Sequence, residues 1–280
     1  MLHRFERPQS IAEAARLLAS GPWAVLAGGT DLYPAHVGRP VATPLLDITA
    51  IAALRGIHRD ERGWTIGATT TWTDVVRAEL PPLFDALEAA AREVGGVQIQ
   101  NAGTVAGNVC NASPAADGTP VLLALGARVV LQSERGEREL ALDEFVLGSR
   151  RTARADDELV VALRIPARSA RARSAFAKLG GRRYLTISIS TVAVVVDVDA
   201  NGAVAEASVA VGSCSAVARR LPALEARLIG VAADSDLAAR LELDDLAPLT
   251  PIDDLRGSAA YRRDATATLV RRALREAATT

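Results

Sequence analysis

The chain has 280 residues, a formal net charge of -1 and 49% apolar residues, which is typical of a globular protein of one or two domains. The near-neutral charge argues against nucleic acid as the main partner, because neutralising phosphates requires a basic face. No apolar run approaches the roughly 18–20 residues that span a bilayer, and the charged N-terminus has no signal-peptide core. We therefore expect a cytoplasmic protein without a membrane span.

In the first half of the chain, the pattern predicts short strands alternating with helices. Ser10 and Glu13 have the spacing of a capping box, which predicts a helix from there to about Ala19. A further helix is predicted to begin near Thr73. The remaining predicted helices are Pro82–Val94 and Pro120–Leu125, and the predicted strands are Trp23–Ala27, Leu45–Asp47, Trp64–Ala68, Arg128–Ser133 and Glu158–Ile165.

The composition changes at Ala167–Arg173, a basic stretch without large apolar side chains. We place a domain boundary there, which gives domains of residues 1–170 and 171–280. Beyond it, Asn201-Gly202 is a strong hairpin signal between strands predicted at Ser190–Asp199 and Val204–Ser213. Helices are predicted at Ala218–Leu228, Ser235–Leu241 and Ser258–Ala277, so the second half reads as a small antiparallel sheet backed by helices.

The first candidate site is Ala27-Gly28-Gly29-Thr30-Asp31, directly after an apolar strand. Glycine permits a close approach of the backbone to a ligand, and successive backbone N–H groups in such a turn bind anions. Taken alone, this signal is weak, because a glycine pair after a strand is more often a simple turn.

A second glycine-rich stretch, Asn101–Asn108, reads as another turn and continues to Asp117 through further small polar residues. Polar side chains are costly to bury without partners, and this stretch lies between apolar segments. A phosphate-rich ligand would supply the partners, whereas the alternative is a polar surface loop.

Several motifs of catalysis are absent from the sequence. No GxGxxG follows a strand, and no Walker A motif occurs. The only cysteines, Cys110 and Cys214, form no CxxC, so this chain alone cannot build a zinc or iron–sulfur site; we expect both to be reduced and buried. With few groups for acid–base chemistry, the reactivity must come from a cofactor.

In order along the chain, Ala27–Asp31, Thr65–Ala68, Asn101–Asn108, Ser113–Asp117 and the C-terminal stretch Asp254–Arg263 resemble the FAD-binding medium subunit of the xanthine dehydrogenase and carbon monoxide dehydrogenase family. The resemblance covers nearly the whole chain. It implies an α+β fold: a vanillyl-alcohol-oxidase-type FAD-binding domain of two subdomains, followed by a small C-terminal α+β domain with an antiparallel sheet and helices.

The resemblance also implies which residues contact FAD. They are Ala27, Gly28, Gly29, Thr30, Asp31 and Leu32 in the first stretch, Asn101, Thr104, Ala106, Gly107 and Asn108 in the second, and Ser113, Asp117, Val160 and Lys178 beyond it. Tyr184 or its neighbours would lie against the flavin ring. From the residues alone, Lys178 could equally be a solvated lysine and Val160 a plain core residue. Ala106 departs from the family, which often has glycine there, so its methyl group needs a compatible φ.

By the same resemblance, the chain would work with a molybdopterin-binding large subunit, which oxidises the substrate, and a small subunit with [2Fe–2S] clusters. Electrons would pass through those clusters to the flavin and on to NAD, oxygen or a quinone. Two alternatives stay open: a self-sufficient FAD oxidoreductase of the same fold superfamily, and a flavin-free nucleotide-binding scaffold. The substrate is not readable from this chain.

Overall fold

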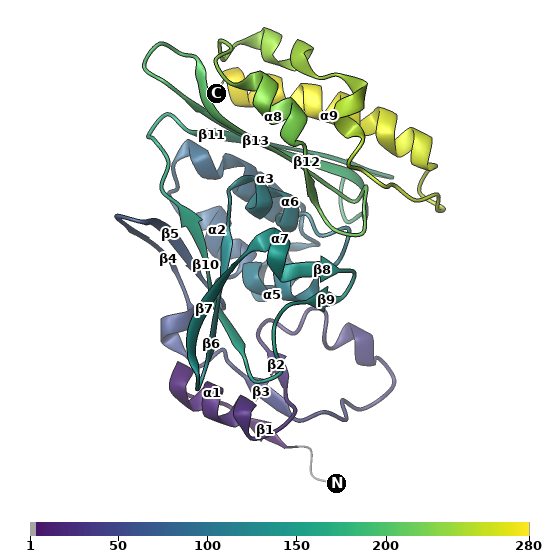
Figure 1. Cartoon of the computed structure of the whole chain (residues 1–280). Coiled ribbons are helices and arrows are strands. Elements are labelled where there is room, and N and C mark those ends of the chain that lie inside the picture. The colour runs from purple at the N-terminus through teal and green to yellow at the C-terminus, as the bar shows by residue number, and fades with distance from the viewer. Residues whose placement is uncertain (1–3, 280) are drawn as a thin grey trace.

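A computed structural model describes residues 4–279. Three parts follow one another along the long axis in Figure 1: a small parallel sheet near the N-terminus, a five-stranded antiparallel sheet with its helices, and a four-stranded antiparallel sheet that carries the C-terminal helices. The α+β class expected from the sequence is confirmed. Within the described residues, no helix has the length and apolar character that crossing a membrane requires.

The small N-terminal sheet has the strand order β1-β3-β2, with parallel pairing throughout. Its strands are β1 (Phe5–Glu6), β2 (Ala24–Leu26) and β3 (Leu45–Asp47). Helix α1 (Ile11–Ala19) begins as predicted, because the Ser10 hydroxyl accepts the backbone N–H of Glu13. The Glu13 carboxylate, in turn, accepts the backbone N–H of Gln9. Short 3-10 turns, η1 (Pro34–His36) and η2 (Ala52–Leu54), follow β2 and β3.

The five-stranded sheet has the order β4-β5-β10-β6-β7 and is antiparallel. Its strands are β4 (Ile57–Asp60), β5 (Gly63–Gly67), β6 (Arg128–Ser133), β7 (Gly136–Ala141) and β10 (Leu159–Pro166). The accompanying short elements are α2 (Trp72–Arg77), η3 (Pro82–Phe84), α3 (Asp85–Glu93), α6 (Gly118–Ala124), α7 (Leu142–Phe145), β8 (Val146–Gly148) and β9 (Arg151–Thr152).

The second glycine-rich stretch is not the turn that the sequence suggested. It forms the end of α4 (Val97–Ala102), a two-residue junction, and most of α5 (Val105–Asn111). Thr104 caps α5, because its hydroxyl accepts the backbone N–H of Gly107. Neither Gly103 nor Gly107 adopts a positive φ. The prediction was wrong because small residues fit a tight helix–helix junction as well as they fit a turn.

The C-terminal sheet has the order β11-β12-β13-β14 and is antiparallel. Its strands are β11 (Arg173–Gly180), β12 (Ser188–Val198), β13 (Val204–Gly212) and β14 (Arg219–Arg220). The helices are α8 (Pro222–Leu228), η4 (Ser235–Arg240), η5 (Leu243–Leu246) and α9 (Ala259–Thr279). The hairpin predicted at Asn201-Gly202 is confirmed, with Gly202 at φ +81. Strand β11 was not predicted.

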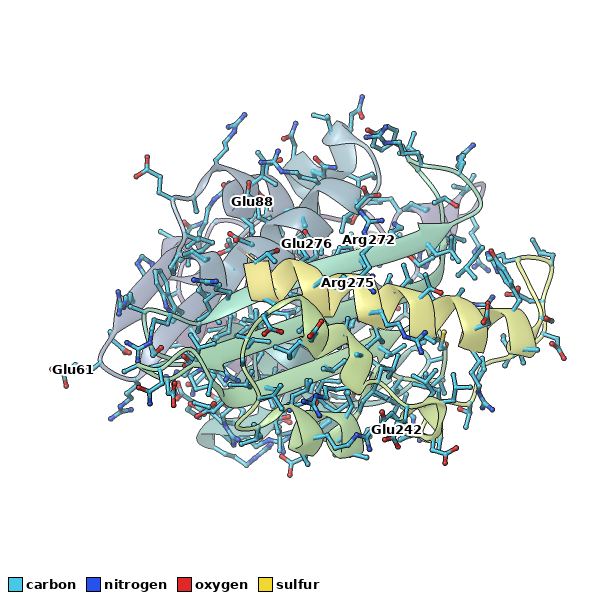
Figure 2. The ribbon with its side chains drawn as sticks, turned by 90° about the horizontal axis from the view of Figure 1, so that it is seen from above. Glu61, Glu88, Glu242, Arg272, Arg275 and Glu276 are labelled. Atoms are coloured by element: carbon cyan, nitrogen blue, oxygen red, sulfur yellow. The ribbon has the colours of Figure 1, made fainter. Side chains whose placement is uncertain are left out.

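This C-terminal sheet is covered on both faces. Val192, Val194 and Val196 of β12 pack with α8 and α9, whereas Ala193 and Val195 belong to the same buried cluster as α3 and α6. Figure 2 shows α9 lying across the sheet. Burial on both faces explains why the central part of β12, Val192–Val196, is an apolar run without polar alternation. The division at residue 170 falls in the link between β10 and β11 and stays a prediction.

Candidate functional site

A cavity of about 630 Å³ opens beside the loop that follows β2. Its walls come from that loop, from the first turns of α5 and from the start of β10. The predicted site residues that line it are Ala27, Gly28, Gly29, Thr30, Asp31, Leu32, Thr104, Ala106, Gly107, Asn108 and Val160. The fold thus brings together residues that are more than 130 positions apart in the chain.

Two glycines shape the first loop. A Cβ on Gly28 would lie 1.9 Å from the carbonyl oxygen of Ala102, so only glycine lets this loop approach the end of α4. Gly29 has φ +70, which side chains rarely adopt. In the described part of the chain, the backbone N–H groups of Gly28–Leu32 donate to no protein acceptor. A run of free N–H groups at a cavity wall suits an anion or another acceptor-rich ligand.

Ala106 lies within α5 and is buried. It is not among the residues of positive φ, so the methyl group fits an ordinary helical backbone. The departure from the family's usual glycine therefore costs no strain. Beside it, a Cβ on Gly107 would lie 2.7 Å from the Thr104 hydroxyl oxygen, and the contact that caps α5 would be disturbed.

One buried polar atom of the cavity wall lacks a partner. Asn108 Oδ1 makes no hydrogen bond within the described residues although solvent does not reach it. An unsatisfied buried acceptor costs about 1–3 kcal/mol, so the arrangement fits a ligand that donates a hydrogen bond there.

At the rim of the cavity, the Asp31 carboxylate is bound by neighbouring side chains of the protein. Its Oδ1 accepts from Asn111 Nδ2 at 2.8 Å and lies 3.7 Å from Arg150 Nη1. Arg150, with φ +58, also donates to Asn111 Oδ1. The rim thus joins the first loop, the end of α5 and the β8–β9 turn.

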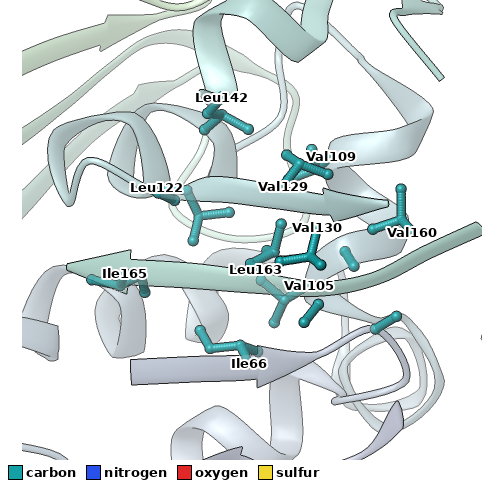
Figure 3. Close-up of a cluster of buried hydrophobic side chains, with 14 of the residues drawn as sticks. Ile66, Val105, Val109, Leu122, Val129, Val130, Leu142, Val160, Leu163 and Ile165 are labelled. Carbon is teal, nitrogen blue, oxygen red and sulfur yellow. The ribbon is translucent and has the colours of Figure 1, made fainter. Parts of the chain in front are cut away.

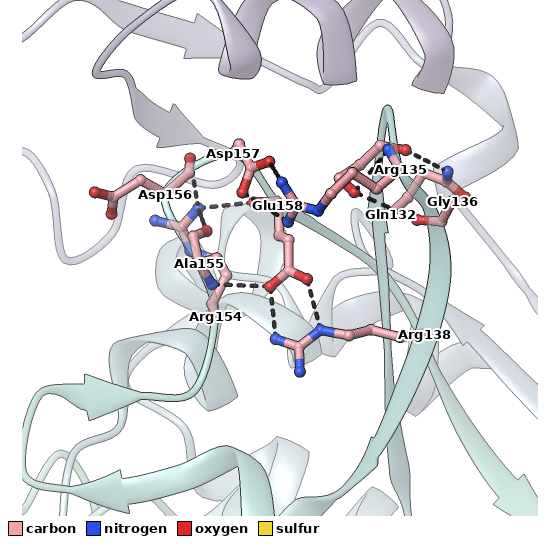
Figure 4. Close-up of polar contacts among 10 residues, drawn as sticks. Gln132, Arg135, Gly136, Arg138, Arg154, Ala155, Asp156, Asp157 and Glu158 are labelled. Carbon is pink, nitrogen blue, oxygen red and sulfur yellow. Dashed lines mark hydrogen bonds and ion pairs between the residues drawn. The ribbon is translucent and has the colours of Figure 1, made fainter.

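The start of strand β10 supplies a further part of the cavity wall. Val160 is 4% exposed and packs in the core shown in Figure 3, with a register shift between Val160 and Ala162. Just before the strand, the buried Glu158 binds Arg138 through Nε at 2.6 Å and Nη2 at 2.7 Å (Figure 4). The Arg138 guanidinium holds the pKa of the Glu158 carboxyl below its ordinary value.

Four predicted residues do not line this cavity: Asn101, Ser113, Asp117 and Lys178. Asp117 and Lys178 instead form a buried ion pair, with Nζ to Oδ2 at 2.7 Å. The other carboxylate oxygen accepts from Ser188 Oγ at 2.6 Å. Burial raises the pKa of the Asp117 carboxyl, although the Lys178 ammonium opposes that rise. The solvated alternative for Lys178 is wrong, since its side chain is only 8% exposed.

The remaining predicted residues make local contacts. Asn101 Oδ1 accepts from Thr73 Oγ1 at 2.6 Å, and Ser113 Oγ accepts from the backbone N–H of Ala115 at 3.4 Å. Tyr184 is 58% exposed and lies under the guanidinium of Arg183.

Two arginines of the cavity wall, both from the segment before β10, were not predicted from the sequence. Arg150 and Arg154 line the cavity, but nothing in their local sequence distinguishes them from other surface arginines. Cys110 also lines it and is exposed, so the expectation that both cysteines are buried is wrong for Cys110 and confirmed for Cys214. Both cysteines are free thiols.

The cavity is suited to binding rather than to acid–base chemistry. The acidic side chains in its wall, Asp31 and Glu158, are both engaged by arginines. Within residues 4–279, no group of three or more histidine, cysteine or carboxylate side chains is placed to hold a metal ion. The volume, the free N–H groups and the orphaned Asn108 oxygen fit an extended ligand rich in hydrogen-bonding groups.

Comparisons with known proteins agree with this geometry. A family described as "FAD binding domain in molybdopterin dehydrogenase" matches residues 2–168, and one described as "CO dehydrogenase flavoprotein C-terminal domain" matches residues 174–277. The carbon monoxide dehydrogenase medium chain of Hydrogenophaga pseudoflava is 32% identical, over 98% of this chain and 97% of the relative. The nicotinate dehydrogenase FAD-subunit of Eubacterium barkeri is 34% identical, over 81% and 79%.

Solved structures give the same result. A chain of the reconstituted CO dehydrogenase from Oligotropha carboxidovorans superposes with a TM-score of 0.90 at 28% identity, covering 99% of this chain and 98% of that one. A carbon monoxide dehydrogenase chain from Hydrogenophaga pseudoflava superposes with a TM-score of 0.86 at 31% identity, covering 98% and 96%. The chain therefore belongs to the family of FAD-binding medium subunits of the molybdenum hydroxylases, which includes those of carbon monoxide dehydrogenase and xanthine dehydrogenase, and its cofactor is FAD.

Proposed function

We propose that this chain is the electron-transferring subunit of a molybdenum hydroxylase complex in the cytoplasm. Its partners are a molybdopterin-binding large subunit, which oxidises the substrate, and a small subunit with [2Fe–2S] clusters. Electrons enter this chain one at a time from those clusters and leave to NAD, oxygen or a quinone. When bound, FAD supplies the exchange between one-electron and two-electron carriers.

The observation that carries this proposal is a large cavity whose acidic side chains are already paired. Asp31 faces Arg150 and Asn111, and Glu158 faces Arg138. A flavoenzyme that oxidises its own organic substrate needs a placed acid or base to move the substrate's proton. The commitment of these carboxylates to arginines supports a chain that binds FAD and exchanges electrons with partner proteins.

The chain's own residues then have binding roles. The N–H groups of Gly28–Leu32 bind the pyrophosphate of FAD. Asn108 Oδ1 accepts a hydrogen bond from a hydroxyl of the cofactor, which satisfies the buried oxygen. Asp117 and Lys178 lie outside the cavity lining as a buried ion pair at the boundary of α6 and β11, and only the family resemblance supports them as cofactor contacts.

The test is to purify the full chain alone and together with the two proposed partners. The chain alone should carry FAD, show the visible spectrum of a flavoprotein, and turn over no purine, aldehyde or alcohol. The three-subunit complex should turn over one of these substrate classes, with reduction of the flavin absorbance. Reoxidation of the reduced complex by NAD, oxygen and a quinone, each added separately, identifies the acceptor.

Two results would contradict the proposal. Turnover of an organic substrate by the single chain would identify a self-sufficient oxidoreductase. Failure of the FAD-loaded chain to accept electrons from a reduced iron–sulfur partner would remove the electron-transfer role while leaving FAD binding intact.

A further inference from the structure

The charged side chains of the cavity wall are Asp31, Glu158, Arg150 and Arg154. Three of them have an oppositely charged partner within the protein. Asp31 faces Arg150, and Glu158 is bound through both carboxylate oxygens by Arg138, which lies outside the cavity lining. The positive charge that remains is that of Arg154.

Arg154 is held in place by backbone groups alone. Its Nη1 donates to the carbonyl oxygens of Glu158 at 2.7 Å, Ala155 at 3.1 Å and Asp156 at 3.4 Å (Figure 4). These contacts fix the guanidinium without neutralising it. The Nε and Nη2 groups make no hydrogen bond within the described residues.

Among the described residues, Arg154 forms no ion pair with a carboxylate. Asp157 lies in the same turn, and the charge of Arg154 helps to lower the pKa of its carboxyl. The Asp157 carboxylate is bound by Arg135 instead, with Nη2 to Oδ1 at 3.1 Å (Figure 4). The side chain is half-buried in the wall of the cavity. A ligand that covers it removes water from a charge that has no counterion, which is unfavourable unless the ligand brings the opposite charge.

We infer that Arg154 binds the pyrophosphate of FAD. At neutral pH the formal negative charges of oxidised FAD are those of its two phosphates, so a lone cation in the FAD cavity has one partner of opposite sign. A guanidinium fixed through one nitrogen still presents Nε–H and Nη2–H to phosphate oxygens. The inference rests on FAD binding by this chain and not on the identity of its partner subunits or its electron acceptor.

The test is titration of the deflavinated full-length chain with FAD and, separately, with riboflavin, which has no phosphates. Flavin fluorescence reports binding at low and at high salt. R154Q removes the charge but keeps an amide N–H donor, and R154K keeps the charge but loses the fork of donors. R151Q is the matched control, because Arg151 is exposed on the same segment and does not line the cavity.

R154Q should weaken FAD binding about tenfold or more, the size of a charge-assisted phosphate contact. It should leave riboflavin binding unchanged and flatten the salt dependence of FAD binding. R154K should fall between R154Q and the wild type, and R151Q should match the wild type for both ligands. Thermal unfolding of each deflavinated variant confirms that it is folded.

Equal FAD affinity in R154Q and the wild type would overturn the inference. So would an equal loss of FAD and riboflavin affinity, because Arg154 would then only pin the turn before β10. The wild type provides a second test that needs no variant: its FAD affinity must fall with salt more steeply than its riboflavin affinity, and equal slopes would also overturn the inference.

Discussion

At the scale of single residues, two small positions of the cavity wall are under opposite constraints. Gly28 faces the Ala102 carbonyl oxygen so closely that no side chain fits. Ala106 is buried in α5 with an ordinary helical backbone, so its methyl group adds packing without strain. The sequence pattern identified both positions but not this difference, because it predicted a turn where the chain forms a helix.

Ala106→Gly tests this interpretation of the second stretch. Glycine in a helix costs about 0.5–1 kcal/mol relative to alanine, so the variant should have a lower free energy of unfolding and an unchanged FAD affinity. Urea unfolding and flavin fluorescence titration measure the two quantities. Tighter FAD binding by the variant would show that the methyl group obstructs the cofactor.

Glu158 should make stability depend on acid pH. Its pKa in the folded chain lies below the ordinary value of 4.5, chiefly through Arg138. A lowered folded pKa stabilises the fold above that ordinary value, and this stabilisation is lost as the pH falls through the folded pKa. Wild type should therefore exceed Glu158→Gln in stability most clearly above pH 4.5, and the difference should shrink in more acidic solution.

The measurement is urea unfolding across acid and neutral pH, with Glu134→Gln as the matched control on the neighbouring exposed hairpin turn. If the difference in free energy of unfolding between wild type and Glu158→Gln grows as the pH falls, its sign is opposite to that expected for the Glu158–Arg138 ion pair. That result would show that the ion pair does not stabilise the fold.

Among single residues, the glycine, threonine and asparagine positions of the cavity were predictable because each has a backbone or capping role tied to its residue type. Arg150 and Arg154 were not, because an arginine in a sequence carries no sign of which wall it joins. The placement of Arg150 depends on the β8–β9 turn, which is fixed by long-range contacts such as Arg150 N to Ala112 O at 2.9 Å. The placement of Arg154 depends on the turn that precedes β10.

At the scale of elements, long and periodic segments were predictable and short ones were not. Strands β12 and β13 follow from their β-branched runs and the turn between them, and α9 follows from its length. Helices α4 and α5 are six and seven residues long, too short for a helical period to be read. Strand β11 was missed because alanine and lysine within it favour helices.

The attachment of α9 depends on Arg262, whose side chain is only 3% exposed. It donates to the carbonyl oxygens of Ile189 and Ser213 and to Asp254 Oδ1 at 2.8 Å. Arg262→Met removes these three buried contacts and should lower the free energy of unfolding by about 3 kcal/mol.

Arg263→Met is the control, because Arg263 is exposed one position further along α9 and should change stability by less than about 0.5 kcal/mol. Urea unfolding compares the two variants. Equal effects would mean that Arg262 does not anchor the helix.

At the scale of the whole molecule, the four-stranded sheet joins the two halves of the chain. Ala193, Val195 and Ala210 share a buried cluster with α3 and α6, and the Lys178–Asp117 pair crosses the same boundary. This joining was not readable from the sequence, where the basic stretch at Ala167–Arg173 indicates only a change of composition. The division into domains of residues 1–170 and 171–280 thus remains a prediction, and the two predicted domains share part of their buried core.

A shared core predicts cooperative unfolding. The deflavinated chain should melt in one transition, with equal calorimetric and van't Hoff enthalpies. Differential scanning calorimetry measures both. Two resolved transitions would show that the two halves are independent in stability despite their contact.

A crystal structure of the full chain with FAD bound would show whether the cavity between the Gly28–Leu32 loop and α5 holds the cofactor. We expect the pyrophosphate within hydrogen-bonding distance of the backbone N–H groups of Gly28–Leu32, with a cofactor donor at Asn108 Oδ1. A pyrophosphate bound outside this cavity, with those groups still free, would contradict this expectation.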